Sequence, residues 1–259
     1  MRTTQHAPEI IIKDLTIGWP GHEVLRNANL VLPAGKISVI LGGSGDGKST
    51  LLRHILGLNK PIAGSIHIDG HNISSMDAEA GHVLRSHMGV LFQNGAMLGS
   101  MTLGENVAMP LREHTDLDEE TIETVVRLKL SLVGLERFME YYPSQLSGGM
   151  RKRAGLARAL VLDPRILLCD EPSAGLDPIT AAALDQLILD LHDTFTMTIV
   201  VVTHDLDSMF TIAQHVVALH AGELVFQGGV EDLKASQNAF LQQFLARQPG
   251  ERARPTLDF

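Results

Sequence analysis

Residues 37–50 read ISVILGGSGDGKST, an apolar run that leads into a loop rich in glycine. The stretch from Gly42 to Ser49 matches the pattern G-x-x-x-x-G-K-[ST] of a phosphate-binding loop. Lys48 would place a positive charge at the β and γ phosphates, and Ser49 would offer a hydroxyl to Mg²⁺. The following helix would point the positive end of its dipole at the phosphates. The residues predicted to surround a nucleotide are Gly42, Gly43, Ser44, Gly45, Asp46, Gly47, Lys48, Ser49 and Thr50.

A second apolar run, residues 165–171, reads RILLCDE and ends in two acids. A buried strand would deliver both carboxylates to the carboxyl edge of a sheet, beside the glycine loop. There Asp170 would hold Mg²⁺, and Glu171 would orient and polarise an attacking water. Cys169 is expected to belong to the strand core, because a small sulfur side chain in an apolar run usually packs there.

The bulk composition excludes several classes of protein. The 259 residues carry a net charge of −9, which argues against broad nucleic-acid binding. No apolar stretch approaches the ~18 residues of a membrane span, and residues 1–8 lack the apolar segment of a secretory signal. One cysteine excludes an internal disulfide framework, and the twelve histidines are scattered. We therefore expect a cytosolic protein that reaches a membrane through a partner.

The order of elements predicts an α/β fold. Strands alternating with helices favour a mostly parallel sheet covered on both faces, and the helical periodicity of residues 103–162 indicates an inserted helical segment. The polar tail of residues 249–259 is expected to be flexible. Strands are predicted at residues 9–17, 30–32, 37–41, 65–70, 165–170 and 198–203, and helices at about 49–57, 122–133, 150–160, 181–192 and 230–247.

Several further motifs follow in a fixed order along the chain. Residues 146–150 read LSGGM, residues 91–94 read LFQN around Gln93, residues 173–177 read SAGLD and end at Asp177, and residues 202–205 read VTHD around His204. With Trp19 in the place of an adenine-stacking aromatic, the chain resembles the ATPase subunits of ABC transporters over about residues 9–228. Their signature ends in Gln, where this chain has Met150.

The resemblance implies a specific architecture. It is a P-loop NTPase (RecA-like) core with an N-terminal antiparallel β subdomain and an inserted α-helical subdomain. The whole chain would be one ABC ATPase domain. Its core would take about residues 1–95 and 163–228, its helical signature subdomain about 96–162, and its C-terminal helix and tail 229–259.

The resemblance also implies the roles of residues. Ser147, Gly148 and Gly149 would bind the γ-phosphate held by a second copy, so that two chains close head to tail on two ATP molecules. Glu171, His204, Lys48 and Gln93 would be catalytic. Gln93 would join Ser49 and Asp170 around Mg²⁺, while Trp19 and Asp177 would contact the nucleotide. From the residues themselves, Ser147 is expected to cap the helix that follows it.

Two smaller features carry open alternatives. The basic residues Arg151, Lys152, Arg153 and Arg158 form either a solvated helix face or a group near the phosphates, and both are favoured over nucleic-acid binding. Residues 103–115, reading LGENVAMPLREHT, lie where the family docks its membrane partner. Together with LSGGM and the continuation DPIT over residues 177–180, they are similar to the ATPase of MCE-linked (Mla-type) phospholipid transporters. That resemblance implies a permease, an MCE protein and a STAS-domain protein as partners, at the cytoplasmic face of the inner membrane.

Other functions share most of these motifs. An ABC importer ATPase for another small solute would have the same catalytic residues. A non-transport ABC ATPase is a second alternative, although a long coiled coil or a duplicated set of motifs is lacking here. A nucleotide-binding regulator without hydrolysis is a third, and Glu171 argues against it.

Overall fold

The computed structural model describes residues 6–19 and 21–248; the tail predicted to be flexible lies outside them. The strands are β1 (Ile10–Trp19), β2 (His22–Leu32), β3 (Ile37–Leu41), β4 (Ala63–Ile68), β5 (His71–Asn72), β6 (Met88–Leu91), β7 (Ile166–Asp170), β8 (Thr198–Val202), β9 (His215–His220) and β10 (Glu223–Gly228). The helices are α1 (Lys48–Ile55), α2 (Ala78–Ser86), α3 (Leu103–His114), α4 (Glu119–Leu132), α5 (Gly148–Ala159), α6 (Pro178–Thr194), α7 (Leu206–Ile212), α8 (Val230–Ala235) and α9 (Ala239–Leu245).

The strands form two sheets. The larger has the order β10-β9-β3-β8-β7-β6 and is parallel except for β10, which runs antiparallel to β9. The smaller, β2-β1-β4-β5, is antiparallel throughout. The mostly parallel core sheet and the separate antiparallel subdomain predicted from the sequence are both confirmed.

Alternation along the central strands explains why the large sheet is buried on both faces. In β8, Val200 and Val202 join the core shared with α1 and the antiparallel sheet, whereas Ile199 and Val201 join the core shared with α6 and α7. Side chains of a strand point alternately to opposite faces, so a continuous apolar run serves two cores at once.

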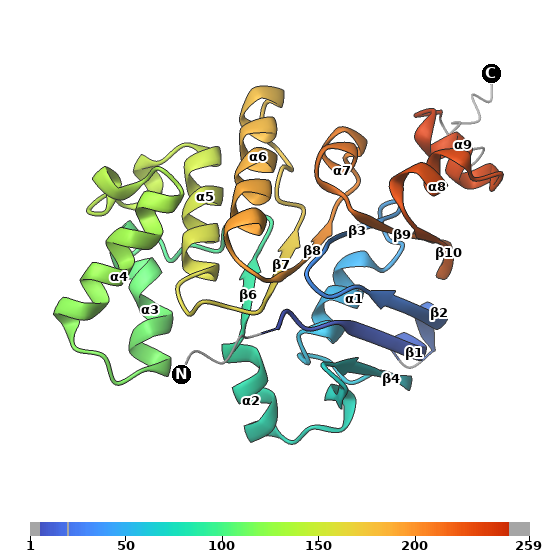
Figure 1. Ribbon diagram of the computed structural model, residues 1–259, viewed down its shortest axis with the longest axis horizontal. Coiled ribbons are helices and arrows are strands. Elements are labelled where there is room, and N and C mark those ends of the chain that lie inside the picture. Colours follow the sequence, from blue (N-terminus) through green and yellow to red (C-terminus); the bar gives the residue numbers. More distant parts are fainter. Residues whose placement is uncertain (1–5, 20, 249–259) are drawn as a thin grey trace.

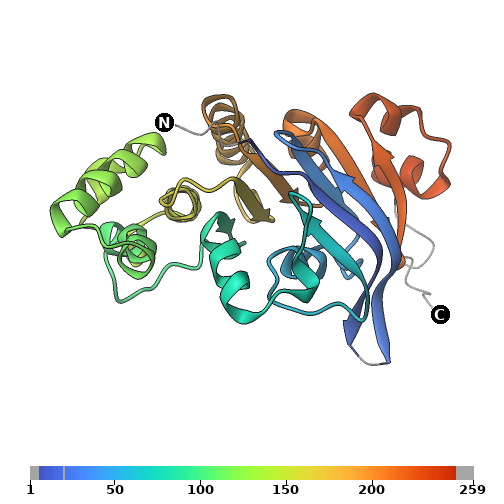
Figure 2. The same cartoon turned by 60° about the horizontal axis from the view of Figure 1, so that its bottom comes forward.

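A third core builds the helical subdomain. Apolar side chains of α3, α4 and α5 pack together there, including Val107, Val126 and Ala154, each fully buried. In both views the α3–α4 pair lies at one end of the molecule and the α8–α9 pair at the other (Figure 1, Figure 2). Helix α5 lies between the α3–α4 pair and the large sheet, and it contacts β6 and α6 as well as α3 and α4.

The C-terminal segment differs from the prediction. A single helix over 230–247 was expected, but the structure has two short helices, α8 and α9. Asn238 explains the break, because its side chain accepts a hydrogen bond from the backbone N–H of Leu241 and caps α9. In the described parts of the chain, we find no helix with the length and apolarity needed to cross a bilayer.

The register of the parallel strands aligns their carboxyl ends at one edge of the large sheet. Val202 of β8 pairs with Ile40 of β3 on one side and with Asp170 of β7 on the other. Leu91 of β6 pairs with Cys169 of β7. The loops that follow β3, β6, β7 and β8 therefore all leave from the same edge, and these loops carry the residues singled out in the sequence.

Candidate active site

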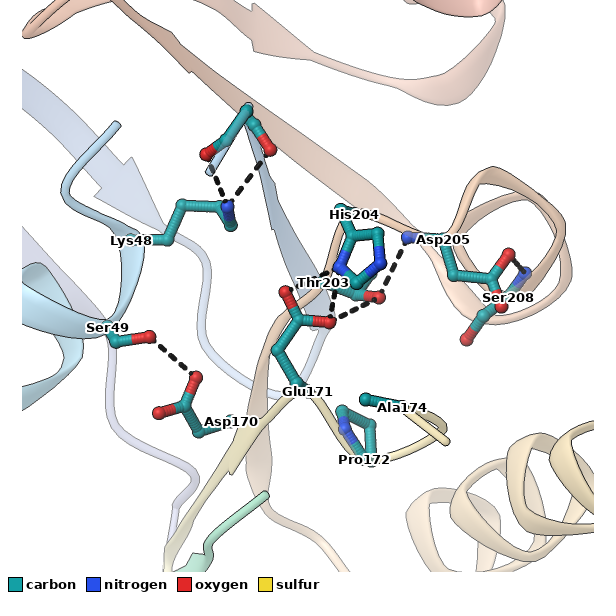
Figure 3. Close-up of polar contacts among 12 residues, drawn as sticks. Lys48, Ser49, Asp170, Glu171, Pro172, Ala174, Thr203, His204, Asp205 and Ser208 are labelled. Carbon is teal, nitrogen blue, oxygen red and sulfur yellow. Dashed lines mark hydrogen bonds and ion pairs between the residues drawn. The ribbon is translucent and has the colours of Figure 1, made fainter. Parts of the chain in front are cut away.

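The glycine loop of residues 42–47 connects β3 to α1 and encloses the ammonium of Lys48. This side chain is 7% exposed, and its Nζ donates to the carbonyl oxygens of Gly42 and Gly43 at 2.9 and 2.8 Å (Figure 3). Gly47 has φ 88°, and a Cβ there would lie 2.7 Å from Cγ1 of Val24. Glycine is therefore required at this position both by backbone conformation and by space.

Asp46 braces this loop. One carboxylate oxygen accepts from the backbone N–H of Gly43 at 2.7 Å, and the other accepts from the N–H of Ala221 at 3.2 Å. The sequence placed Asp46 among the residues around a nucleotide, and the structure adds this link to the β9–β10 turn. Ser44 and Gly45 are exposed at the tip of the loop, and Thr50 is half-buried in α1.

Ser49 and Asp170 come together from positions 121 residues apart. The Ser49 hydroxyl donates to Oδ1 of Asp170 at 2.8 Å (Figure 3). Hydroxyl and carboxylate oxygens are the ligands that Mg²⁺ prefers, so this pair fits a magnesium ion beside the loop. Gln93 is exposed two residues beyond the end of β6, at the same edge of the sheet.

Glu171 points its carboxylate at His204. The Nδ1 atom of His204 lies 2.9 Å from Oε1 and 2.8 Å from Oε2 of Glu171, and the hydroxyl of Thr203 lies 3.5 Å from Oε2 (Figure 3). The Glu171 side chain is 13% exposed, whereas the imidazole is 65% exposed. The carboxylate is thus held beside the glycine loop by a ring that faces solvent.

The backbone of Glu171 is unusual. Its φ of 50° lies in the left-handed region, which non-glycine residues rarely adopt. Its N–H nevertheless donates to the carbonyl oxygen of Val202 at 2.8 Å, which ties the residue to β8. Such outliers persist only where surrounding contacts fix them, and they concentrate at functional sites.

The signature turn, residues 147–149, begins helix α5 as expected. The Ser147 side chain accepts from the N–H of Met150 at 3.2 Å and caps α5, as predicted, although the helix begins at Gly148 rather than Met150. Met150 is half-buried and packs against the core of the helical subdomain. That packing gives a structural reason for an apolar side chain in place of the family's Gln.

Asp177, Trp19 and Cys169 are positioned as follows. Asp177 caps α6, accepting from the hydroxyl and N–H of Thr180 at 2.6 and 3.0 Å, and these bonds lower its pKa. Trp19, at the end of β1, is 56% exposed and stacks on His22 with ring centroids 6.3 Å apart. Cys169 is fully buried, and burial raises the pKa of its thiol to about 12, as expected of a core residue.

The basic residues of α5 have defined partners in the structure. A solvated face or a position near the phosphates was expected, but all four side chains turn back onto backbone carbonyl oxygens of the protein. The contacts run from Arg151 to Leu146, from Lys152 to Glu171, Pro172 and Ala174, from Arg153 to Val133, and from Arg158 to Gly95 and Ala96.

The sequence did not predict which groups Lys152 contacts. Burial lowers the pKa of its ammonium, and the nearby Glu171 opposes that effect. A signal was available in the sequence, because Lys152 recurs at helical spacing with Gly149, Leu156 and Ala159, a pattern that predicts one buried helix face. In the structure all four residues are buried.

Known proteins with similar sequences and structures agree with this geometry. The sequence profile of the ABC transporter family matches residues 25–174. A probable ribonucleotide transport ATP-binding protein of Mycobacterium leprae is 46% identical over 236 residues, which cover 91% of this chain and 68% of that protein. The intermembrane phospholipid transport ATP-binding protein MlaF of Escherichia coli is 42% identical over 234 residues, covering 90% of this chain and 87% of that protein.

A solved structure shows the same fold. It is the ATP-binding cassette MJ0796 in a dimeric, post-hydrolysis state with ADP and Pi, and it aligns with a TM-score of 0.78 and 31% identity. The alignment covers 85% of this chain and 98% of that cassette. The motif order, the two-sheet fold and these similarities lead to one conclusion: this chain belongs to the ABC transporter family, as an ATP-binding subunit that hydrolyses ATP.

Proposed function

We propose that this subunit hydrolyses ATP at the edge of its large sheet and drives the transport of phospholipid between membranes. The observation that carries the hydrolytic site is the pairing of Ser49 with Asp170, followed directly by the Glu171 carboxylate held by His204. Ser49 lies in α1, Asp170 and Glu171 at the end of β7, and His204 just after β8, and the strand register brings them to one place.

Each side chain has a defined task in this proposal. Lys48 exchanges its contacts with two loop carbonyls for the β and γ phosphates, and Trp19 stacks on the adenine. Ser49, Asp170 and Gln93 hold Mg²⁺, which neutralises phosphate charge when bound. Glu171 orients a water for in-line attack on the γ-phosphate. His204 lies beside that carboxylate, where its ring can reach the same phosphate.

Two copies of the chain complete each site. Ser147, Gly148 and Gly149 begin a helix of 12 residues, so their N–H groups and the helix dipole favour an anion. The nucleotide of the same chain already has the N-terminus of α1. We therefore assign this second turn to the γ-phosphate of the partner copy. Asp177, which caps α6, follows Leu176, the residue nearest to where a Cβ of Gly148 would lie.

The transported substrate is inferred from relatives and from residues 103–115. MlaF proteins of Escherichia coli and Haemophilus influenzae, named for intermembrane phospholipid transport, are 42% and 39% identical to this chain. By that likeness the subunit works with a permease, an MCE protein and a STAS-domain protein at the cytoplasmic face of the inner membrane. The mycobacterial relative, named for ribonucleotide transport, is 46% identical and supports a small-solute alternative.

Replacement of Glu171 by Gln tests the hydrolytic site. We expect the isolated chain to bind ATP normally, because the loop and Lys48 are untouched. In the assembled complex, turnover should fall by roughly 10²–10⁴-fold, the usual contribution of a positioned proton acceptor. Lys48→Ala should instead lose nucleotide binding. Normal turnover in Glu171→Gln would refute the assignment of this carboxylate.

A second experiment tests the partner contact and the substrate. Ser147→Arg should leave nucleotide binding by the isolated chain intact and stop hydrolysis in the complex; unchanged hydrolysis would exclude the shared site. The complex purified from membranes should contain an MCE protein and move labelled phospholipid between vesicles when ATP is added. ATP-dependent movement of a nucleotide or another solute instead would favour the alternative.

A further inference from the structure

Lys152 of α5 binds the loop that carries Glu171 at three points. Its Nζ donates to the carbonyl oxygens of Pro172 and Ala174, both at 2.6 Å, and of Glu171 at 3.3 Å. An ammonium has three N–H donors, and three acceptors surround this one. The side chain is 6% exposed, so these bonds lie out of water.

Lys152 gives this loop a second support from outside, beside the bond from the Glu171 N–H to Val202 of β8. Glu171 holds a left-handed backbone conformation with φ 50°. Within the loop, the N–H of Ala174 donates to the carbonyl oxygen of Glu171 at 3.2 Å, and that of Leu176 donates to Ser173 at 3.1 Å. These are turn contacts inside the loop. Lys152 fixes the same loop to a separate rigid element, α5.

Helix α5 carries the signature turn at its N-terminus. Lys152 lies five residues after the cap Ser147, less than two helical turns away. The turn is held to the helix by the cap and by Arg151, which donates to the carbonyl oxygen of Leu146 at 2.7 Å. A displacement of the signature turn therefore moves Lys152 with it.

We infer that Lys152 is a positioning residue that makes the hydrolytic loop of a chain follow its own signature turn. The inference rests on the proposed function, in which that turn binds the partner's γ-phosphate and Glu171 serves the chain's own ATP. Through α5 and Lys152, the arrival of ATP at one site then sets the position of Glu171 at the other. The link lies within one chain and connects both sites.

Lys152→Met tests this link, because it keeps the length of the side chain and removes every donor. Nucleotide affinity of the isolated chain should not change, since Lys152 does not touch the 42–49 loop. In the assembled complex, kcat should fall roughly 10- to 100-fold with little change in KM, the scale of a misplaced catalytic group. Lys152→Arg keeps charged donors and should regain most of the lost rate.

The control variant is Arg127→Met, which removes a cation of α4 that pairs with Glu123 at the surface. It should behave as wild type in every assay. If Lys152→Met folds poorly, Lys152→Gln serves in its place, because its shorter side chain with two donors cannot reproduce the three bonds of the ammonium. Wild-type kcat in folded Lys152→Met or Lys152→Gln, with Glu171→Gln inactive, would overturn the inference and leave the proposed function standing. Activity in Glu171→Gln would refute the proposed function itself.

Amide hydrogen exchange separates positioning from general stability. Complexes with Glu171→Gln hold ATP without turnover, so bound nucleotide should protect peptides over residues 147–153 and 171–176. Adding Lys152→Met should abolish the ATP-dependent protection of 171–176 and preserve that of 147–153. Equal protection of 171–176 in both complexes, or no response to ATP in either, would contradict the link.

Discussion

The two glycines of the signature turn should respond in opposite ways to the same substitution. A Cβ at Gly149 would lie 2.5 Å from Cγ2 of Thr180 in α6. A Cβ at Gly148 would lie 3.7 Å from Cδ2 of Leu176, an ordinary contact distance. Thr180 cannot rotate freely, because its hydroxyl donates to Asp177 at 2.6 Å. Gly149 is therefore constrained by packing in the free chain, whereas Gly148 is not.

The magnitudes follow from two opposing effects. Alanine is favoured over glycine in a helix by about 1 kcal/mol. Overpacking a close contact costs about 1–3 kcal/mol. Gly149→Ala should thus lower the free energy of unfolding by about 0–2 kcal/mol, since its clash offsets the helical gain. Gly148→Ala should leave it unchanged or raise it by up to about 1 kcal/mol.

Urea unfolding of the isolated chain measures both effects, with Thr180→Ser as the matched partner. Serine removes Cγ2 and keeps the hydroxyl bonded to Asp177. In the Thr180→Ser background, Gly149→Ala should become neutral or stabilising, which gives a coupling energy of about 1–3 kcal/mol. A coupling energy near zero would refute the packing argument.

ATPase assays then separate packing from phosphate contact. The Cβ that Gly149→Ala introduces would face α6, so this variant should lose hydrolysis only through its clash with Thr180. The double variant Gly149→Ala/Thr180→Ser should therefore recover hydrolysis together with stability. Gly148→Ala should keep its stability and lose hydrolysis, because its added Cβ would keep the partner's phosphate away from the N–H groups at the start of α5. Full hydrolysis in Gly148→Ala would show that this glycine does not require close approach to a phosphate.

Three further outcomes are expected. Thr198→Val should lower the free energy of unfolding by about 2–6 kcal/mol in urea titrations, because the buried hydroxyl joins Gly35 and Pro8 and each of these two orphaned groups costs about 1–3 kcal/mol. Burial raises the pKa of Asp185, so the native state binds more protons than the unfolded state. Stability therefore falls as pH rises from the ordinary aspartate pKa of 3.8 through the raised one, and Asp185→Asn should remove that slope. Met150→Gln should retain hydrolysis and lose less than about 1.5 kcal/mol of stability, since the two side chains have similar volumes.

The sequence predicted the parts of the site that are local in the chain. The glycine loop, its strand and its helix are contiguous, so their spacing alone places Lys48 and Ser49. The acidic end of β7 was predicted in the same way. Because parallel strands end at one edge, Asp170 and Ser49 could be expected to meet, and they are bonded at 2.8 Å.

The sequence did not predict contacts that depend on tertiary packing. The carbonyl oxygens that hold Lys152 lie 19 to 22 residues further along the chain, and they converge only because α5 packs beside the end of β7. A basic residue is usually solvated, so the charge pattern of α5 did not indicate that Lys152 is buried. The helical spacing of residue 152 relative to apolar residues of α5 was the better indication that its side chain is buried.

The antiparallel subdomain helps to hold the glycine loop of residues 42–47 in its conformation. Val24 of β2 lies against Gly47, where a Cβ would approach its Cγ1 to 2.7 Å. Nearby, the N–H of Arg26 donates to the carbonyl oxygen of Gly222 at 2.9 Å, and Asp46 accepts from Ala221 in the same turn. The loop is thus held between β2 and the β9–β10 turn. Because both sheets meet there, a shift of the antiparallel sheet must change the loop that surrounds Lys48.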